Sequence, residues 1–148
     1  MSTLLILGRI LFSLIFLSSG INHIAKVEAM TGYAKYKKLP AAKLGVILSG
    51  IVLVLASLMI ILGYYVDIAG EALAVFTLLT AFIFQNFWTE TDAMAKMTAT
   101  VSFFKDIALS GAALVFVGYA HVAQQLFDAN KSHALGWAVS YAKMAIWK

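Results

Sequence analysis

The stretch that decides the fold is residues 44–66, LGVILSGIVLVLASLMIILGYYV, which contains no charged side chain. A helix needs about 20 mostly apolar residues to cross the ~30 Å hydrocarbon core of a bilayer. Three further stretches, at residues 4–24, 72–88 and 107–127, are nearly as apolar. The sequence therefore predicts a protein that crosses a membrane several times, and its 148 residues leave little length for a soluble domain.

The composition agrees with this prediction, because 62% of the residues are hydrophobic and only 12% are charged. An average soluble domain has about 25% charged residues. We predict an all-α, integral membrane four-helix bundle over residues 1–127, with spans at about 4–24, 44–65, 72–88 and 105–127. In the tail, apolar residues at near-helical spacing predict a C-terminal interfacial amphipathic helix over residues 128–148: Leu135, Val139, Ala142 and Ile146.

The net charge of +4 comes from lysine and arginine residues that lie outside the spans or close to their ends. Anionic lipid headgroups are a simpler partner for them than nucleic acid, which we do not expect to bind. Most of these residues fall in the first and third loops, and the positive-inside rule places those loops in the cytoplasm. The absence of cysteine excludes thiolate catalysis, disulfide exchange and iron–sulfur ligation by this chain.

Two groups of polar residues gather where spans end. On the face of the first loop, three antiparallel spans bring six residues to one level, and such convergence is what a polar pocket requires. This face is expected either to bind a quinone carbonyl, a polar lipid group or a loop of a partner, or only to cap the helices. Its members are Asn22, His23, Gln85, Asn86, Lys105 and Asp106.

The opposite face carries a second polar cluster, Arg9, Asp67, Glu71 and His121. Arg9 lies about one and a half turns inside its span, so it either snorkels to water as an anchor or pairs with Glu71 or Asp67. His23 and His121 end spans that run in opposite directions, which argues against a haem held between them. We expect no metal site and assign no catalytic residue.

Several short motifs resemble the DoxX family over about residues 6–118. They are Gly8-Arg9-Ile10, Leu14 to His23 (LIFLSSGINH), Gly32-Tyr33-Ala34, Leu62-Gly63, Phe87-Trp88 and Phe103 to Gly111 (FFKDIALSG). The resemblance implies a four-helix membrane bundle with a quinone-linked or accessory role. Related proteins are named for thiosulfate:quinone oxidoreductase subunits, and others are associated with redox-defence complexes in bacterial membranes.

The chain departs from the family pattern at three places. Many members carry an acidic residue in the second span, where this chain has Leu53, and a histidine near the end of the third, where it has Gln85 and Asn86. Lys105-Asp106 replaces a more usual Lys-Asn pair. Because a proton-coupled reaction would use the titratable groups that are replaced, independent catalysis is less expected here than the family name suggests.

We therefore expect a small DoxX-like subunit or accessory protein of a larger, redox-active complex in the bacterial cytoplasmic membrane. Its partners would be membrane lipids and either other membrane subunits or further copies of itself. One alternative is a quinone-linked oxidoreductase of the thiosulfate:quinone oxidoreductase kind, which would use the face of the first loop. Another is a small lipid-binding protein or transporter, which the uncharged middle of the second span argues against.

Overall fold

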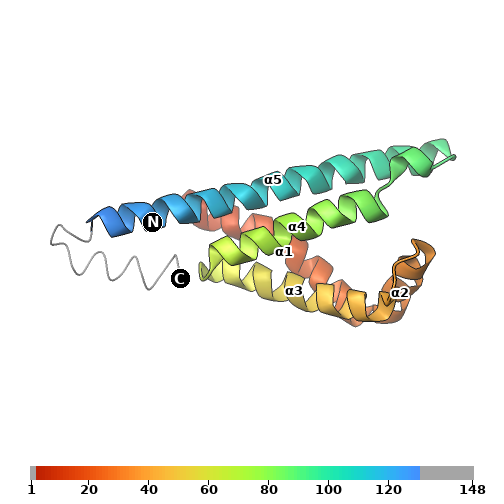
Figure 1. Ribbon diagram of the computed structural model, residues 1–148, viewed down its shortest axis with the longest axis horizontal. Helices are drawn as coiled ribbons and strands as arrows, with labels where there is room; N and C mark the ends of the chain where they lie inside the picture. The colour runs from red at the N-terminus through yellow and green to blue at the C-terminus, as the bar shows by residue number, and fades with distance from the viewer. Residues whose placement is uncertain (1–2, 131–148) are drawn as a thin grey trace.

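The computed structural model describes residues 3–130, and within this range the chain is helical (Figure 1). Four segments are long and apolar enough to cross a membrane, which confirms the predicted all-α membrane bundle. The predicted amphipathic helix over 128–148 lies outside the described residues, except for its first three residues, which continue the last helix. The elements are α1 (Thr3–Ala25), α2 (Val27–Tyr36), α3 (Ala42–Leu62), α4 (Val66–Phe84), the 3-10 helix η1 (Phe87–Thr89) and α5 (Ala93–Asn130).

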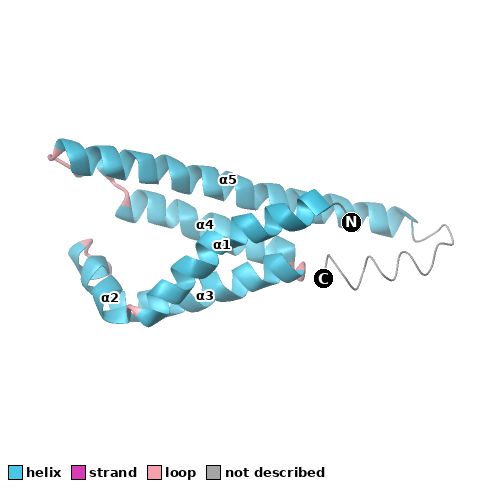
Figure 2. Ribbon diagram, turned by 180° about the vertical axis from the view of Figure 1, so that it is seen from behind, coloured by secondary structure: helices cyan, strands magenta, loops and turns pink. Residues whose placement is uncertain are grey.

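The long helices form two closely packed pairs. α1 lies along α3 and α4 lies along α5, while contacts between α3 and α4 join the pairs (Figures 1 and 2). α2 packs mainly on α3, at the end of the bundle where α1 and α4 end and α3 begins. The two pairs diverge toward this end, so that α2 and the start of α5 lie on its opposite sides (Figures 1 and 2).

Glycine permits the close approach inside each pair. A Cβ atom added to Gly20 of α1 would lie 2.9 Å from the carbonyl oxygen of Gly50 in α3. One added to Gly70 of α4 would lie 2.7 Å from Val117 Cγ2 and 3.0 Å from the carbonyl oxygen of Ala113, both in α5. Because lipid tails are as apolar as leucine, helices in a bilayer associate largely through such close packing of small residues.

Apolar side chains fill the middle of the bundle. Leu53, Ile60 and Leu73 are each 0% exposed, so these positions of α3 and α4 are completely enclosed by protein. Phe12 of α1 packs against Phe116 of α5 with 5.0 Å between ring centroids. This contact also joins the two helix pairs. The departure from the family pattern at Leu53 therefore lies in the core of the fold.

The helices extend beyond the predicted spans at three places. The first loop contains α2, which buries Thr31 and Ala34. The third loop consists largely of the first turns of α5. There Asp92 Oδ2 accepts a hydrogen bond from the Ala95 backbone amide at 2.8 Å. This carboxylate acts as an N-cap, and the helix then starts at Ala93 rather than near residue 105. The third span starts at Val66 rather than near residue 72, because Gly63 ends α3 in the left-handed conformation and only two residues follow it.

Candidate functional site

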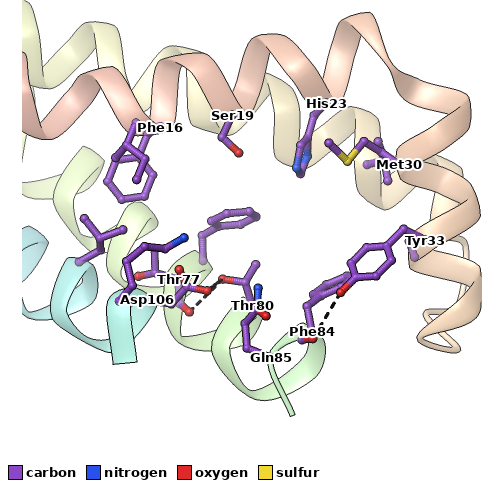
Figure 3. A pocket seen from close by; sticks show the side chains of 16 residues that line it. Phe16, Ser19, His23, Met30, Tyr33, Thr77, Thr80, Phe84, Gln85 and Asp106 are labelled. Atoms are coloured by element: carbon purple, nitrogen blue, oxygen red, sulfur yellow. Dashed lines mark hydrogen bonds between the residues drawn. The ribbon is translucent and has the colours of Figure 1, made fainter. Parts of the chain in front are cut away.

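A cavity of about 250 Å³ lies near the end of the bundle where α1 and α4 end. It is bounded by the last turns of α1 and α4, by α2, by Val46 of α3 and by the part of α5 around Asp106. Figure 3 shows Ser19 and His23 entering it from α1, with Thr80, Gln85 and Asp106 opposite. Side chains from five helices therefore meet around one space.

His23 occupies the α1 side of the cavity, and its ring is held from behind by α3. Its Nδ1 atom lies 2.9 Å from the hydroxyl oxygen of Ser49, and the Ser49 hydroxyl in turn donates to the Val46 carbonyl at 3.0 Å. The ring of Phe76 lies 6.4 Å away in an edge-on arrangement. These contacts fix the plane of the imidazole, so that the ring points into the cavity (Figure 3).

Asp106 provides a carboxyl group on the opposite side. It is buried, and one carboxyl oxygen lies 3.5 Å from the hydroxyl of Thr80, at the long limit of a hydrogen bond. The Thr80 hydroxyl also lies 3.0 Å from the Thr77 carbonyl, which is the better acceptor by distance. Asp106 therefore keeps unused hydrogen-bonding capacity toward the cavity, while the exposed Lys105 lies beside it on the cavity wall.

The rest of the wall is mostly apolar, and much of it is aromatic. Phe16, Phe76 and Phe84 line the cavity, together with the aliphatic side chains Ile15 and Leu109. Ligand sites of small molecules typically combine a mainly apolar lining with a few placed polar groups. The cavity thus suits a flat apolar body that carries polar atoms at its edges.

Helix α2 closes one side of the cavity and is fastened to the end of α4. The ring of Tyr33 stacks on Phe84 at 5.6 Å between centroids, and its hydroxyl donates to the Phe84 carbonyl at 3.5 Å (Figure 3). Lys37 donates to Asn86 Oδ1 at 2.6 Å and lies 3.6 Å from Glu90 Oε1. Partial burial, then the nearby charges of Glu90 and the neighbouring tyrosine Tyr36, raise the pKa of Tyr33 above its ordinary value.

Four of the six residues predicted on this face line the cavity: His23, Gln85, Lys105 and Asp106. The other two do not. Asn22 is exposed, because one residue before His23 on a helix corresponds to a rotation of 100°, which directs its side chain away from the interior. Asn86 instead accepts the hydrogen bond from Lys37 that fastens α2.

The structure does not bring the second predicted cluster together. Arg9 is buried at 3% exposure, but its Nε donates to the Ile60 carbonyl at 2.5 Å and its Nη2 to the Ile61 carbonyl at 2.6 Å. It therefore pairs with the end of α3 rather than with Glu71 or Asp67. Glu71 and His121 are exposed, and Asp67 is half-buried in the first turn of α4.

Sequence reasoning did not find five polar residues of the site: Ser19, Tyr33, Ser49, Thr77 and Thr80. Ser19 precedes His23 by four positions, so the two share a helix face, and this spacing was a usable signal. Tyr33 was hidden because its helix was expected to be a loop. Ser49 and Thr80 lie inside apolar stretches and carry no sequence signal that distinguishes them from helix-packing residues.

Many of the residues that form this site lie in a segment that a protein-family model matches. The model of the DoxX family matches residues 4–86, which is more than half of the chain. The chain belongs to the DoxX family. The match covers α1 to α4 and includes His23 and Gln85, whereas Lys105 and Asp106 on α5 lie beyond it. Searches of curated proteins and of solved structures gave no match.

Proposed function

We propose that this DoxX-family protein is a small membrane subunit that binds a quinone-class molecule in the cavity between α1, α2, α4 and α5. The observation that carries the proposal is the placement of His23 and Asp106 on opposite sides of an aromatic-lined cavity of about 250 Å³. A quinone head is a flat apolar ring with oxygen atoms at its edges. It therefore matches both the aromatic wall and the polar groups.

The position of the cavity supports a ligand that arrives from the membrane. The cavity lies near the ends of the apolar spans, where α1 and α4 end, so a molecule with an isoprenoid tail could place its head there and leave the tail in lipid. The same end carries the lysines of α2 and its flanks, and the positive-inside rule would orient it toward the cytoplasm. We propose on this basis that this end faces the cytoplasm; the bacterial cytoplasmic membrane as location rests on the family resemblance.

An accessory role fits the chain better than independent catalysis. It has no cysteine, so it cannot relay electrons through a thiol pair of its own. Electrons would then pass between the bound molecule and a partner subunit of the same membrane complex. A transporter is less well supported, since Leu53, Ile60 and Leu73 fill the middle of the bundle.

The test is to purify the full chain in a mild detergent and to identify what accompanies it. Mass spectrometry and the ultraviolet spectrum of an organic extract should reveal a near-stoichiometric quinone, and affinity purification should retain partner subunits. The His23→Ala variant should lose the quinone, whereas His121→Ala, an exposed histidine remote from the cavity, should keep it. A monomeric preparation that holds no quinone and takes up none when it is added would refute the proposal.

A further inference from the structure

The hydrogen-bond arrangement around His23 determines which form of a quinone-class ligand fits the cavity. A serine hydroxyl has one hydrogen and two lone pairs. Ser49 also lies 3.0 Å from the Val46 carbonyl, which can only accept, so both contacts of the hydroxyl are hydrogen bonds only if its hydrogen points to this carbonyl. Toward His23 Nδ1, at 2.9 Å, the Ser49 oxygen can then only accept.

This arrangement fixes the tautomer of the ring. In a neutral imidazole one nitrogen carries the hydrogen and the other is a bare acceptor. In the arrangement that makes both Ser49 contacts hydrogen bonds, Nδ1 of His23 donates to Ser49, which puts the hydrogen on Nδ1 and the lone pair on Nε2. The ring points into the cavity, so the side chain offers the ligand an acceptor (Figure 3).

We infer that the site prefers the hydroxyl-bearing, reduced form of its ligand, and that Ser49 is the positioning residue that sets this preference. The inference rests on the proposed function and deepens it. A hydroquinone hydroxyl can donate to Nε2 of His23, whereas a quinone carbonyl has no hydrogen to give and would leave this acceptor unpaired.

The other polar groups of the cavity do not reverse the preference. Lys105 and the amide of Gln85 can donate to a quinone carbonyl, but they can also donate to a hydroxyl oxygen, which has acceptor lone pairs too. Asp106 adds carboxyl oxygens whose hydrogen bonding within the described part of the chain is limited to the long contact with Thr80. One additional hydrogen bond is worth about 1 kcal/mol or somewhat more, so roughly tenfold tighter binding of the hydroquinone is expected.

The experiment uses the full chain in lipid nanodiscs under anaerobic conditions, with three probes: a short-chain benzoquinone, its hydroquinone, and the dimethyl ether of that hydroquinone. The ether keeps the ring and both oxygens but has no hydrogen to donate. Calorimetry should show the hydroquinone binding roughly tenfold more tightly than the other two probes. Ser49→Ala should lose most of this preference, because the ring can then adopt either tautomer.

Ser18→Ala is the matched control, because Ser18 also donates to a carbonyl three residues earlier, at 2.9 Å, but is exposed and does not line the cavity. This variant should retain the preference. As a second readout, nitrogen-15 chemical shifts of the imidazole in the unaltered chain should report hydrogen on Nδ1 of His23 and a bare Nε2.

The outcomes separate the two proposals. Equal binding of all three probes, tighter binding of the quinone, or hydrogen on Nε2 would overturn the preference and leave the proposed function standing. Failure of every probe to bind would overturn the proposed function, and the preference with it. Loss of the preference in Ser18→Ala would show that it does not depend on the His23–Ser49 contact, and would overturn the role given to Ser49.

Discussion

Replacing Arg9 by methionine tests how a buried cation stabilises this bundle. The last four carbonyl groups of a helix have no partner within the helix. In α3 the Met59 carbonyl accepts from the backbone amides of Gly63 and Tyr64, at 2.8 and 3.0 Å. Arg9 supplies donors for the next two carbonyls, those of Ile60 and Ile61. Its positive charge also lies at the negative end of the α3 dipole.

The expected size of the effect follows from these contacts. A hydrogen bond to a charged group contributes about 1.5–3 kcal/mol, so the two bonds together contribute roughly 3–6 kcal/mol. Methionine removes them but also removes the cost of burying the charge, which offsets part of the loss. We therefore expect the free energy of unfolding to fall by about 2–3 kcal/mol. Arg9→Lys, which keeps the charge but loses the planar fork, should lose about half as much.

Unfolding in mixed micelles, followed by circular dichroism as the mole fraction of denaturing detergent rises, measures these differences. The control is Lys96→Met, which removes an exposed cation from the first turns of α5 and should stay within about 0.5 kcal/mol of the unaltered chain. If Arg9→Met were as stable as the unaltered chain, the cost of burying the guanidinium would equal the worth of its bonds. The net stabilisation assigned to Arg9 would then be refuted.

Three further predictions concern packing, a buried hydroxyl and pH. Gly70→Ala should lower the free energy of unfolding by about 1–3 kcal/mol in the same assay, because the new Cβ meets α5, whereas Gly111→Ala, which meets nothing within 4 Å, should not lower it. Ser13→Ala should leave stability unchanged or raise it by about 1 kcal/mol, since the buried Ser13 hydroxyl has no hydrogen-bond partner within residues 3–130; a loss of stability would reveal such a partner. The pKa of Tyr33 is raised in the folded chain. The contribution of this residue to stability is therefore fully present at a pH below its pKa in the unfolded chain, about 10, and is lost as the pH rises through its pKa in the folded chain. Ultraviolet titration of the unaltered chain, compared with Tyr33→Phe, should show the raised pKa of Tyr33. Glu90→Gln should lower that pKa, and an unchanged titration of Tyr33 in this variant would exclude the Glu90 charge as a cause.

The sequence predicted the spans well because a bilayer imposes one strong requirement, a long apolar helix. It predicted their ends less well, because local hydrogen bonds decide where a helix starts. Asp92 caps α5 well before the hydropathy rises, and the spacing of Thr31 and Ala34 marks the buried face of α2, which hydropathy alone hides.

The candidate site was predicted in part for a similar reason. The antiparallel order of the spans places His23, Gln85, Lys105 and Asp106 at one level, and the structure finds all four around the cavity. The depth of a residue in the membrane does not tell which way its side chain points around the helix axis. For this reason Asn22 was predicted to belong to the site, although its side chain is exposed. The partners of Arg9 were missed because they are backbone carbonyls, which a sequence motif does not reveal.

The packing of α1 on α3 connects the fold to the proposed chemistry. A Cβ added at Gly50 would lie 2.9 Å from the Cβ of His23 and 3.2 Å from the carbonyl oxygen of Gly20, so the absence of a side chain at Gly50 is what lets His23 approach α3. That approach brings Nδ1 within reach of Ser49, the residue next to Gly50. The glycine that allows close helix packing thus also places the imidazole where a serine can fix its tautomer. For this reason Gly50→Ala should disturb ligand preference as well as stability, whereas Gly70→Ala, on the α4–α5 contact, should disturb stability alone.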